Sequence, residues 1–257
     1  FLSPGTIFEP VHRIEDCQIE GTDLSKIPLR IYMPISSGKL PALVYFHRGG
    51  WVFGNIEEAD PVCRKLANHL KCIVISVDYR LAPEHPFPKP LKDCYDATLW
   101  VSNNIGNFCG DASRLIVCGE SAGGNIAAAV ALMARDKEGP QIAAQTLIYP
   151  AISSTLEDAS YAECADQYFL TKETMQFFWD MYLQNPEDKK NPYASLELSL
   201  NLRGLPPAVI ITAEHDPLHN EAFEYARALS NANVKTLFKC FPDVIHGFID
   251  LPIYDEQ

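Results

Sequence analysis

The sequence predicts an α/β fold built on a mainly parallel sheet with helices on both faces, and three observations lead to this class. Short apolar runs alternate with longer segments of helical periodicity over most of the chain. The apolar runs are nearly continuous in Val, Ile and Leu, which is typical of strands buried on both faces. With 257 residues, 47% of them hydrophobic, the chain is long enough to bury such a core.

The first two strands are expected to pair antiparallel. The runs VHRIEDCQIE (11–20) and IPLRIYMP (27–34) are separated only by the turn-rich segment GTDLSK. Six further strands then alternate with helices, which makes eight strands in all. These strands are expected at 41–47, 72–78, 114–119, 143–150, 207–214 and 234–241, and the helices between them at 61–70, 91–104, 121–136 and 221–230.

One segment interrupts the alternation. From Ala151 to Gly204 no run has strand character, whereas TKETMQFFWDMYL (171–183) has helical periodicity and a threonine cap. We expect residues 151–204 to be an insertion that lies over the strand ends as a cap. No Gly/Ser-rich or charged linker divides the chain, so residues 1–257 are expected to form a single domain.

Composition limits the partners. A formal net charge of −12 argues against nucleic acid and anionic membranes, which are bound by clustered Lys and Arg. No run approaches the ~20 apolar residues of a membrane span, and no signal peptide is evident. The cysteines form no CxxC pair and no metal-ligand spacing, so we expect reduced thiols, a cytoplasmic protein and no metal. The eight are Cys17, Cys63, Cys72, Cys94, Cys109, Cys118, Cys164 and Cys240.

The segment GESAG (119–123) carries the sharpest chemical signal. It lies where the run RLIVC ends and the helical segment NIAAAVALMARD begins. A strained turn between strand and helix exposes a serine hydroxyl, and only small flanking residues such as Gly119 and Gly123 allow it. The alternative is that Ser121 is an ordinary helix N-cap. The position favours a nucleophile at Ser121.

A serine nucleophile needs a base, and the base needs a carboxylate to orient it. Asp216 follows the run PAVIITAE, and His246 follows VKTLFKCF. Both are therefore expected at the carboxyl edge of the sheet, where the turn of Ser121 also emerges. The order Ser, acid, His is the order of the hydrolases that use such a turn.

Other acids and histidines compete for these roles. Glu214 is still at the strand end, and Asp243 precedes His246 too closely for easy alignment with its ring. His12, His69, His85, His215 and His219 are expected in strand, helix or loop positions with packing or solvent roles. Asp216 and His246 remain the favoured pair.

The segment HRGGW (47–51) follows the run PALVYF and is rich in glycine. Acyl transfer passes through an oxyanion, which backbone N–H groups stabilise. We assign Gly49, Gly50 and Ala122 as the oxyanion donors. A plain Gly-Gly turn is the alternative.

Together these motifs resemble the hormone-sensitive-lipase-like (family IV) carboxylesterases, a group that includes the arylacetamide deacetylases. The resemblance also rests on DYRLAPEHPFP (78–88), LPPAVIITAEHDPL (205–218) and HGF (246–248), and so covers nearly the whole chain. It implies the α/β-hydrolase fold, no metal or organic cofactor, and hydrolysis of esters with short to medium acyl chains.

Two residues depart from that family's usual motifs. Arg48 stands where HGGG has its first glycine, and Glu120 stands where aspartate is commoner. If position 48 required a positive φ, arginine there would cost about 1–2 kcal/mol. We expect instead that the backbone tolerates a side chain, and that Arg48 points away from the oxyanion hole or toward the entrance, where it tunes substrate choice.

The resemblance also implies N-terminal cap helices and a C-terminal helix, and neither is evident in the chain as given. Acyl-chain preference is therefore left open. We expect the apolar walls of the substrate pocket to include Trp51, Phe53, Phe178 and Trp179, with a core role as the alternative for each aromatic.

The expected reaction is an acyl-enzyme mechanism whose rate falls in acid, because His246 must be neutral to accept a proton. Amide hydrolysis, deacetylation or acyl transfer with the same triad stays open. So does a non-catalytic receptor, as in the plant gibberellin receptors, which resemble this family but lack the catalytic histidine. The expected partner is a small-molecule ester, and whether the protein forms a homodimer also stays open.

Overall fold

The computed structural model describes residues 8–163 and 170–250. Eight strands form one sheet in the order β1-β2-β4-β3-β5-β6-β7-β8. Its strands are β1 (Arg13–Glu20), β2 (Lys26–Met33), β3 (Leu40–Phe46), β4 (Ile73–Val77), β5 (Gly110–Glu120), β6 (Ala144–Ile148), β7 (Ala208–His215) and β8 (Thr236–Ile245). The prediction of a mainly parallel eight-stranded sheet is confirmed.

The antiparallel start is also confirmed. Strand β2 pairs antiparallel with β1 and with β4, and the pairs from β4 through β8 are parallel. The sheet therefore reverses direction only at β2. Every residue of β4 is buried, as the continuous apolar run predicts for a strand inside a parallel sheet.

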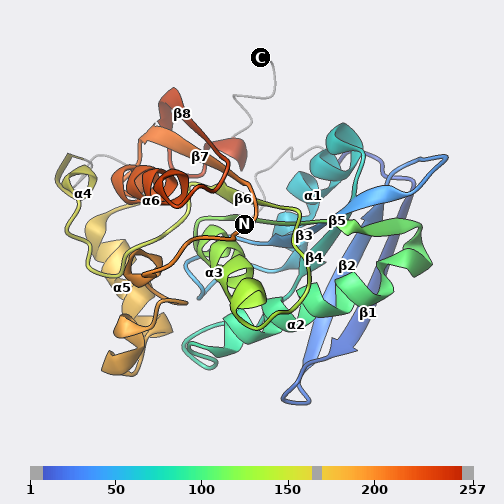
Figure 1. Cartoon of the computed structure of the whole chain (residues 1–257), viewed down its shortest axis with the longest axis horizontal. Coiled ribbons are helices and arrows are strands. Elements are labelled where there is room, and N and C mark those ends of the chain that lie inside the picture. Colours follow the sequence, from blue (N-terminus) through green and yellow to red (C-terminus); the bar gives the residue numbers. More distant parts are fainter. Residues whose placement is uncertain (1–7, 164–169, 251–257) are drawn as a thin grey trace.

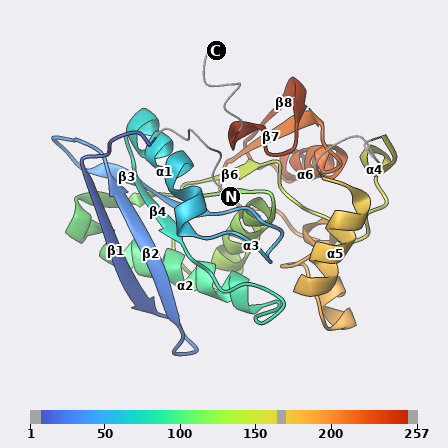
Figure 2. The ribbon, with the colours of Figure 1, turned by 180° about the vertical axis from the view of Figure 1, so that it is seen from behind.

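Helices cover both faces of the sheet (Figure 1). Buried side chains of α2, α3 and α6 pack in one large core, whereas those of α1 pack in a second core on the opposite face, seen from behind in Figure 2. The four helices are α1 (Ile56–Leu70), α2 (Lys89–Asn104), α3 (Ala122–Asp136) and α6 (His219–Asn231).

All four helix starts differ from the predicted ones, by one to five residues, and two of the differences have identifiable reasons. Helix α1 begins at Ile56 rather than near Pro61, because the Asn55 side chain accepts a hydrogen bond of 2.9 Å from the Glu58 N–H and caps the helix a turn earlier. Helix α3 begins at Ala122 rather than Ser121, because Ser121 has φ 55° and ψ −117°, outside the helical region.

The insertion 151–204 contains no strand among its described residues. It carries α4 (Ala159–Glu163), α5 (Lys172–Tyr182) and two short 3₁₀ helices, η2 (Pro186–Lys190) and η3 (Leu196–Leu198). Thr171 caps α5 as expected, since its hydroxyl accepts from the Thr174 N–H at 3.2 Å. The remaining 3₁₀ helices are η1 (Ile105–Phe108), before β5, and η4 (Phe248–Asp250), after β8.

Candidate active site

Ser121 lies in the turn between β5 and α3, as the GESAG segment predicts. Its positive φ is strained for a residue with a side chain, and the surrounding glycines make room for the turn. A Cβ on Gly119 would overlap the Gly123 carbonyl, and a Cβ on Gly123 would overlap the Phe46 carbonyl. The Ser121 N–H donates to the Ile148 carbonyl at 2.9 Å, which ties the turn to β6.

His246 and Asp216 meet Ser121 at the carboxyl edge of the sheet. The His246 Nε2 atom lies 3.0 Å from Ser121 Oγ, and its Nδ1 atom lies 2.7 Å from Asp216 Oδ2. Asp216 is fully buried, and its other oxygen accepts from the Leu218 N–H at 2.9 Å. The imidazole of His246 is therefore held between the Asp216 carboxylate and the Ser121 hydroxyl. This is the geometry of a serine nucleophile with its general base.

The competing acids lie elsewhere. Glu214 accepts from the Asp243 N–H at 2.9 Å, so these two acids contact one another rather than the His246 ring. Glu214, His215 and Asp243 also form a group whose potential ligand atoms lie within 4.8 Å of one another. Both acids of that group are exposed, and we assign no metal to it.

The other histidines have local partners or buried positions. His69 lies 3.0 Å from Glu9 on the surface, and His219 lies 3.1 Å from the Thr212 hydroxyl. His47 is buried under the glycine loop, where its Nδ1 lies 2.7 Å from the Arg48 carbonyl oxygen and its ring stacks on Tyr79 at 4.1 Å. Burial lowers the pKa of His47 to about 4, so its imidazole is neutral near pH 7.

The HRGGW loop is a tight turn with three successive positive φ angles. Gly49 has φ 118°, Gly50 φ 61° and Trp51 φ 61°. The Gly49 carbonyl accepts from the Val52 and Phe53 N–H groups at 3.0 and 2.8 Å. Among the described residues, the N–H groups of Gly49 and Gly50 donate to no backbone carbonyl of a turn or loop. Ala122 opens α3, and an N–H at a helix start has no acceptor within its helix.

Arg48 does not adopt a positive φ, so the expectation that the backbone accommodates a side chain there is confirmed. Arg48 is one of the residues that line a small cavity, together with Tyr45, His47, Glu58 and Glu120. The lining of that cavity includes none of Ser121, the two loop glycines or Ala122.

The four aromatic residues expected as pocket walls fall into two pairs. Trp51 and Trp179 are fully buried, with ring centroids 4.2 Å apart, and Trp51 also stacks on Tyr182 at 4.5 Å. These contacts give both tryptophans a packing role between the glycine loop and α5. Phe53 is 58% exposed and meets Phe178 edge-on at 6.1 Å.

Phe178 lies directly against the glycine loop. A Cβ on Gly50 would overlap its ring, so glycine is required for this approach as well as for the positive φ. Phe177 of the same helix is 47% exposed and lies 5.8 Å from Phe178. Phe178 therefore contacts the glycine loop, and Phe53 and Phe177 both adjoin the Phe178 ring.

Two tyrosines beside the triad were not found by sequence reasoning. Tyr149 follows β6, and its ring lies 4.6 Å from the His246 ring. Its hydroxyl donates to Glu120 at 2.9 Å, and Tyr45 donates to the other oxygen of the same carboxylate. The available signal was the place of Tyr149 directly after a buried strand, at the same edge as Ser121, Asp216 and His246.

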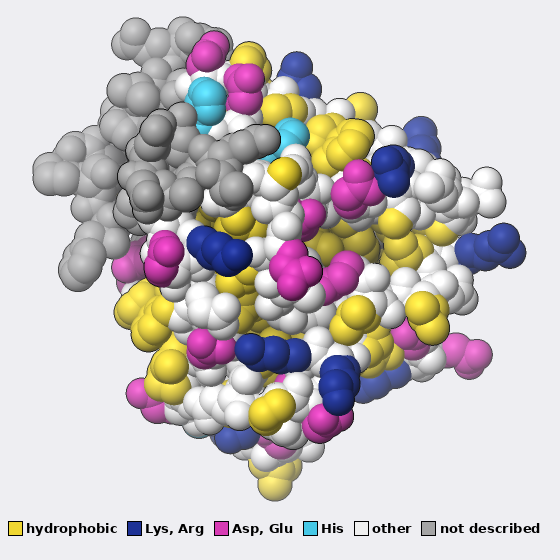
Figure 3. Space-filling model, turned by 90° about the vertical axis from the view of Figure 1, so that its left-hand side faces the viewer, with side chains coloured by type: hydrophobic (Ala, Val, Ile, Leu, Met, Phe, Trp, Pro, Cys, Tyr) yellow, Lys and Arg dark blue, Asp and Glu magenta, His cyan; other side chains and the backbone are white. Residues whose placement is uncertain are grey.

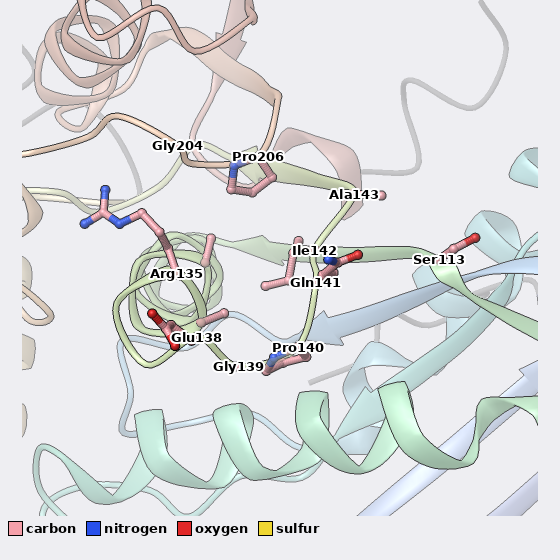
Figure 4. Close-up of a pocket in the computed structure, with 12 residues that line it drawn as sticks. Ser113, Arg135, Glu138, Gly139, Pro140, Gln141, Ile142, Ala143, Gly204 and Pro206 are labelled. Carbon is pink, nitrogen blue, oxygen red and sulfur yellow. The ribbon is translucent and has the colours of Figure 1, made fainter.

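A cavity of about 480 Å³ lies at the opposite edge of the sheet (Figure 4). It is lined by Arg135 at the end of α3, by Glu138 just after that helix, and by residues that precede β6 and β7, among them Ala143 and Pro206. This cavity is at the amino ends of those strands, away from the triad.

The surface and helices give two further facts. On the face of the molecule that carries α4, α5 and α6, acidic, basic and hydrophobic side chains are interspersed, and the basic ones do not gather into a patch (Figure 3). Within residues 8–163 and 170–250, no helix combines the length and apolar character needed to cross a bilayer.

Comparison with known proteins agrees with this geometry. The family model described as the alpha/beta hydrolase fold matches residues 43–250. The chain belongs to this family.

Its relatives define the class of reaction. The chain is 39% identical over 248 residues to the carboxylesterase NlhH of Mycobacterium tuberculosis, covering 95% of this chain and 78% of that protein. It is 36% identical over 250 residues to an arylesterase of Saccharolobus solfataricus, covering 97% and 81%. The structure of a hyperthermophilic esterase from the archaeon Pyrobaculum calidifontis superposes with a TM-score of 0.90 at 43% identity, covering 94% and 80%. The protein is a serine hydrolase of carboxylic esters.

Proposed function

We propose that the protein hydrolyses esters of short to medium acyl chains, with Ser121 as nucleophile, His246 as general base and Asp216 as the acid that orients the histidine. The observation that supports this assignment most strongly is the relay of 3.0 Å from Ser121 to His246 and 2.7 Å from His246 to Asp216. Three segments far apart in sequence supply these atoms, and they converge at one edge of the sheet.

The first half of the reaction forms an acyl-enzyme. His246 Nε2 accepts the Ser121 proton as Oγ attacks the ester carbonyl, and the carbonyl oxygen becomes an oxyanion. The imidazolium then donates that proton to the departing alcohol as the bond between the carbonyl carbon and the alcohol oxygen breaks. Asp216 stays ionised and stabilises the imidazolium.

The second half repeats these steps with water. His246 accepts a proton from water, the resulting hydroxide attacks the acyl carbon, and Ser121 leaves with the proton from His246. The enzyme returns to its starting state, and the products are one carboxylic acid and one alcohol.

We assign the oxyanion to the N–H groups of Gly49, Gly50 and Ala122. The loop glycines adopt φ angles that side chains rarely allow, and Ala122 sits at the helix start where the dipole of α3 favours negative charge. Each such donor contributes about 10²–10³ in rate.

The acyl or alcohol group is proposed to lie against Phe53 and Phe178. Both rings adjoin the oxyanion loop, and Phe53 is exposed enough to contact a ligand. The insertion 151–204 would act as the cap in the single domain, since α5 carries Phe178. Two phenylalanine rings offer a small apolar surface, which suits acyl chains of a few carbons better than long acyl chains.

The test is hydrolysis of p-nitrophenyl esters from acetate to dodecanoate. We expect the highest kcat/KM at short chains, and we expect Ser121→Ala to abolish turnover. Ser113→Ala, an exposed serine on β5, is the matched control and should keep full activity. Equal activity of Ser121→Ala and wild type would overturn the assignment.

A matched amide separates the neighbouring activities. The same triad can cleave amides or transfer the acyl group to an alcohol, so initial rates on an ester and its isosteric amide should be compared. Ester hydrolysis faster by about 10²-fold or more supports the proposal, because an amine is a poorer leaving group than an alcohol. Ligand binding without turnover would indicate a receptor.

We also propose that the protein works in the reducing cytoplasm and binds no nucleic acid. The described cysteines are free, and burial raises the pKa of Cys63 and Cys94 well above the ordinary thiol value, which makes both unreactive. Thiol titration of the protein as isolated from cells tests the first proposal, and light scattering on a sizing column tests whether it forms a homodimer.

A further inference from the structure

The two residues that depart from the family's usual motifs meet in one place. Arg48 of the glycine loop and Glu120 at the end of β5 line the same small cavity, beneath the start of α1. Glu58 of α1 lines it as well. Arginine in place of glycine and glutamate in place of aspartate are therefore two changes at one site, although 72 positions separate them in sequence.

Glu120 is a buried acid, with 1% of its surface exposed. Tyr45 and Tyr149 donate hydrogen bonds to its two oxygens, but phenols carry no charge. A buried carboxylate is costly unless a cation also lies nearby. Within the cavity lining the candidates are His47 and Arg48, and burial lowers the pKa of His47 so that it is neutral. Arg48 remains as the counter-charge.

Glu120 and Arg48 each lie next to a residue that adjoins His246. Glu120 binds the hydroxyl of Tyr149, whose ring lies 4.6 Å from the His246 ring and 5.8 Å from Phe248. The Arg48 guanidinium approaches the next residue, since its Nη1 atom lies 3.9 Å from where a Cβ of Gly247 would be. Tyr149, held by Glu120, therefore adjoins His246 and Phe248, and Arg48 adjoins Gly247 between them.

We propose that Arg48 and Glu120 are positioning residues for His246, acting as a charge pair that holds the Tyr149 ring and the Gly247 turn in place. The proposal rests on the assigned function, because it explains how this chain fixes the proposed base. The expectation that Arg48 tunes substrate choice stays a separate prediction, and the experiment below distinguishes the two roles.

The experiment is a double-mutant cycle with Arg48→Gln, Glu120→Gln and the double variant, assayed on p-nitrophenyl acetate. Each single change should lower kcat about tenfold with KM within about twofold, because a base displaced by a fraction of an ångström loses rate rather than ground-state binding. The double variant should be no slower than either single one, because both changes break the same pair. Arg48→Lys and Glu120→Asp should recover part of kcat.

Labelling of Ser121 by a fluorophosphonate gives a second readout, and its rate should fall in step with kcat. An exposed ion pair of the insertion, Glu187 with Lys190 at 2.9 Å, is the matched control: the same cycle there should leave kcat unchanged. Circular dichroism checks that each variant is folded. If Glu120→Gln does not fold, Arg48→Gln is compared with Arg48→Lys: the lysine variant should be the faster one, and equal loss of kcat in both overturns the proposal.

Three outcomes overturn the proposal. Effects of the two single changes that multiply in the double variant show that the residues act independently. If Arg48→Gln is coupled to Glu58→Gln and not to Glu120→Gln, the partner of Arg48 is Glu58 and the proposed pair is wrong. A change of KM that differs between neutral and acidic esters, with kcat unchanged, places Arg48 at the substrate. Failure of the proposed function is distinct from these outcomes, because it appears in wild type as the absence of Ser121 labelling.

Discussion

Acidification should destabilise this protein through His47, the histidine buried under the glycine loop. Burial lowers the pKa of His47 to about 4 from an ordinary value of 6.5. In the unfolded chain the imidazole takes up a proton as pH falls through 6.5, whereas in the folded protein it does so only near 4. The unfolded state therefore binds more protons in this window, and stability falls as pH falls.

The magnitude follows from those two values. The folded and unfolded pKa values of His47 differ by 2.5 units (6.5 minus 4). The free energy of unfolding is therefore lower by about 3 kcal/mol at pH 4 than at pH 7. Buried acids act in the opposite sense: burial raises the pKa of Glu197 and Glu221, so acidification stabilises the fold through them. The contribution of His47 must therefore be measured as a difference between variants.

Urea unfolding followed by tryptophan fluorescence at pH 7 and pH 4 measures that difference. Wild type should lose about 3 kcal/mol more between the two pH values than His47→Gln, which cannot titrate. His69→Gln removes an exposed histidine and should behave as wild type does. Identical pH dependence in wild type and His47→Gln would refute the reasoning. If His47→Gln fails to fold, an NMR titration of the His47 ring in wild type decides, and a midpoint near 6.5 would refute it.

Three further predictions concern single side chains. Glu221→Gln should raise the melting temperature by about 2–4 °C at pH 7, because an ionised acid is disfavoured at this buried site. The gain should shrink toward pH 4.5, where both the folded and the unfolded state bind the proton. A constant gain across pH would contradict this prediction. Gly50→Ala should lower kcat/KM by about 10²-fold, because the new methyl overlaps the Phe178 ring, and adding Phe178→Ala should restore part of the loss; no effect of Gly50→Ala on ester kinetics would remove the loop from the oxyanion site. Thr171→Ala should cost about 1 kcal/mol in urea unfolding by loss of the α5 cap, with kcat unchanged.

Much of the fold was accessible from the sequence because it depends on local patterns. Buried strands appear as continuous apolar runs, and each parallel strand ends at the same edge, so Ser121, Asp216 and His246 could be brought together from their positions after strands. The strand order could not be obtained in this way, because the placing of β3 between β4 and β5 depends on pairings between distant segments.

The side-chain environments were harder to predict than the backbone. Trp51 and Trp179 were expected at a pocket wall, but an aromatic near an active site has the same local pattern whether it faces a ligand or the core. Tyr149 was overlooked because its partners, Glu120 and His246, lie 29 and 97 positions away along the chain. Such contacts exist only once the sheet has assembled.

The packing of Trp51 against Trp179 and Tyr182 gives helix α5 two faces that differ in their freedom to change. Its inner face clamps the loop to which we assign two oxyanion donors, so we expect substitutions there to alter the rate on every substrate alike. Its outer face, with the exposed Phe177, can vary without loosening that clamp. New substrate ranges in this lineage should therefore arise from mutations at the outer positions, while the tryptophan and tyrosine beneath them stay fixed.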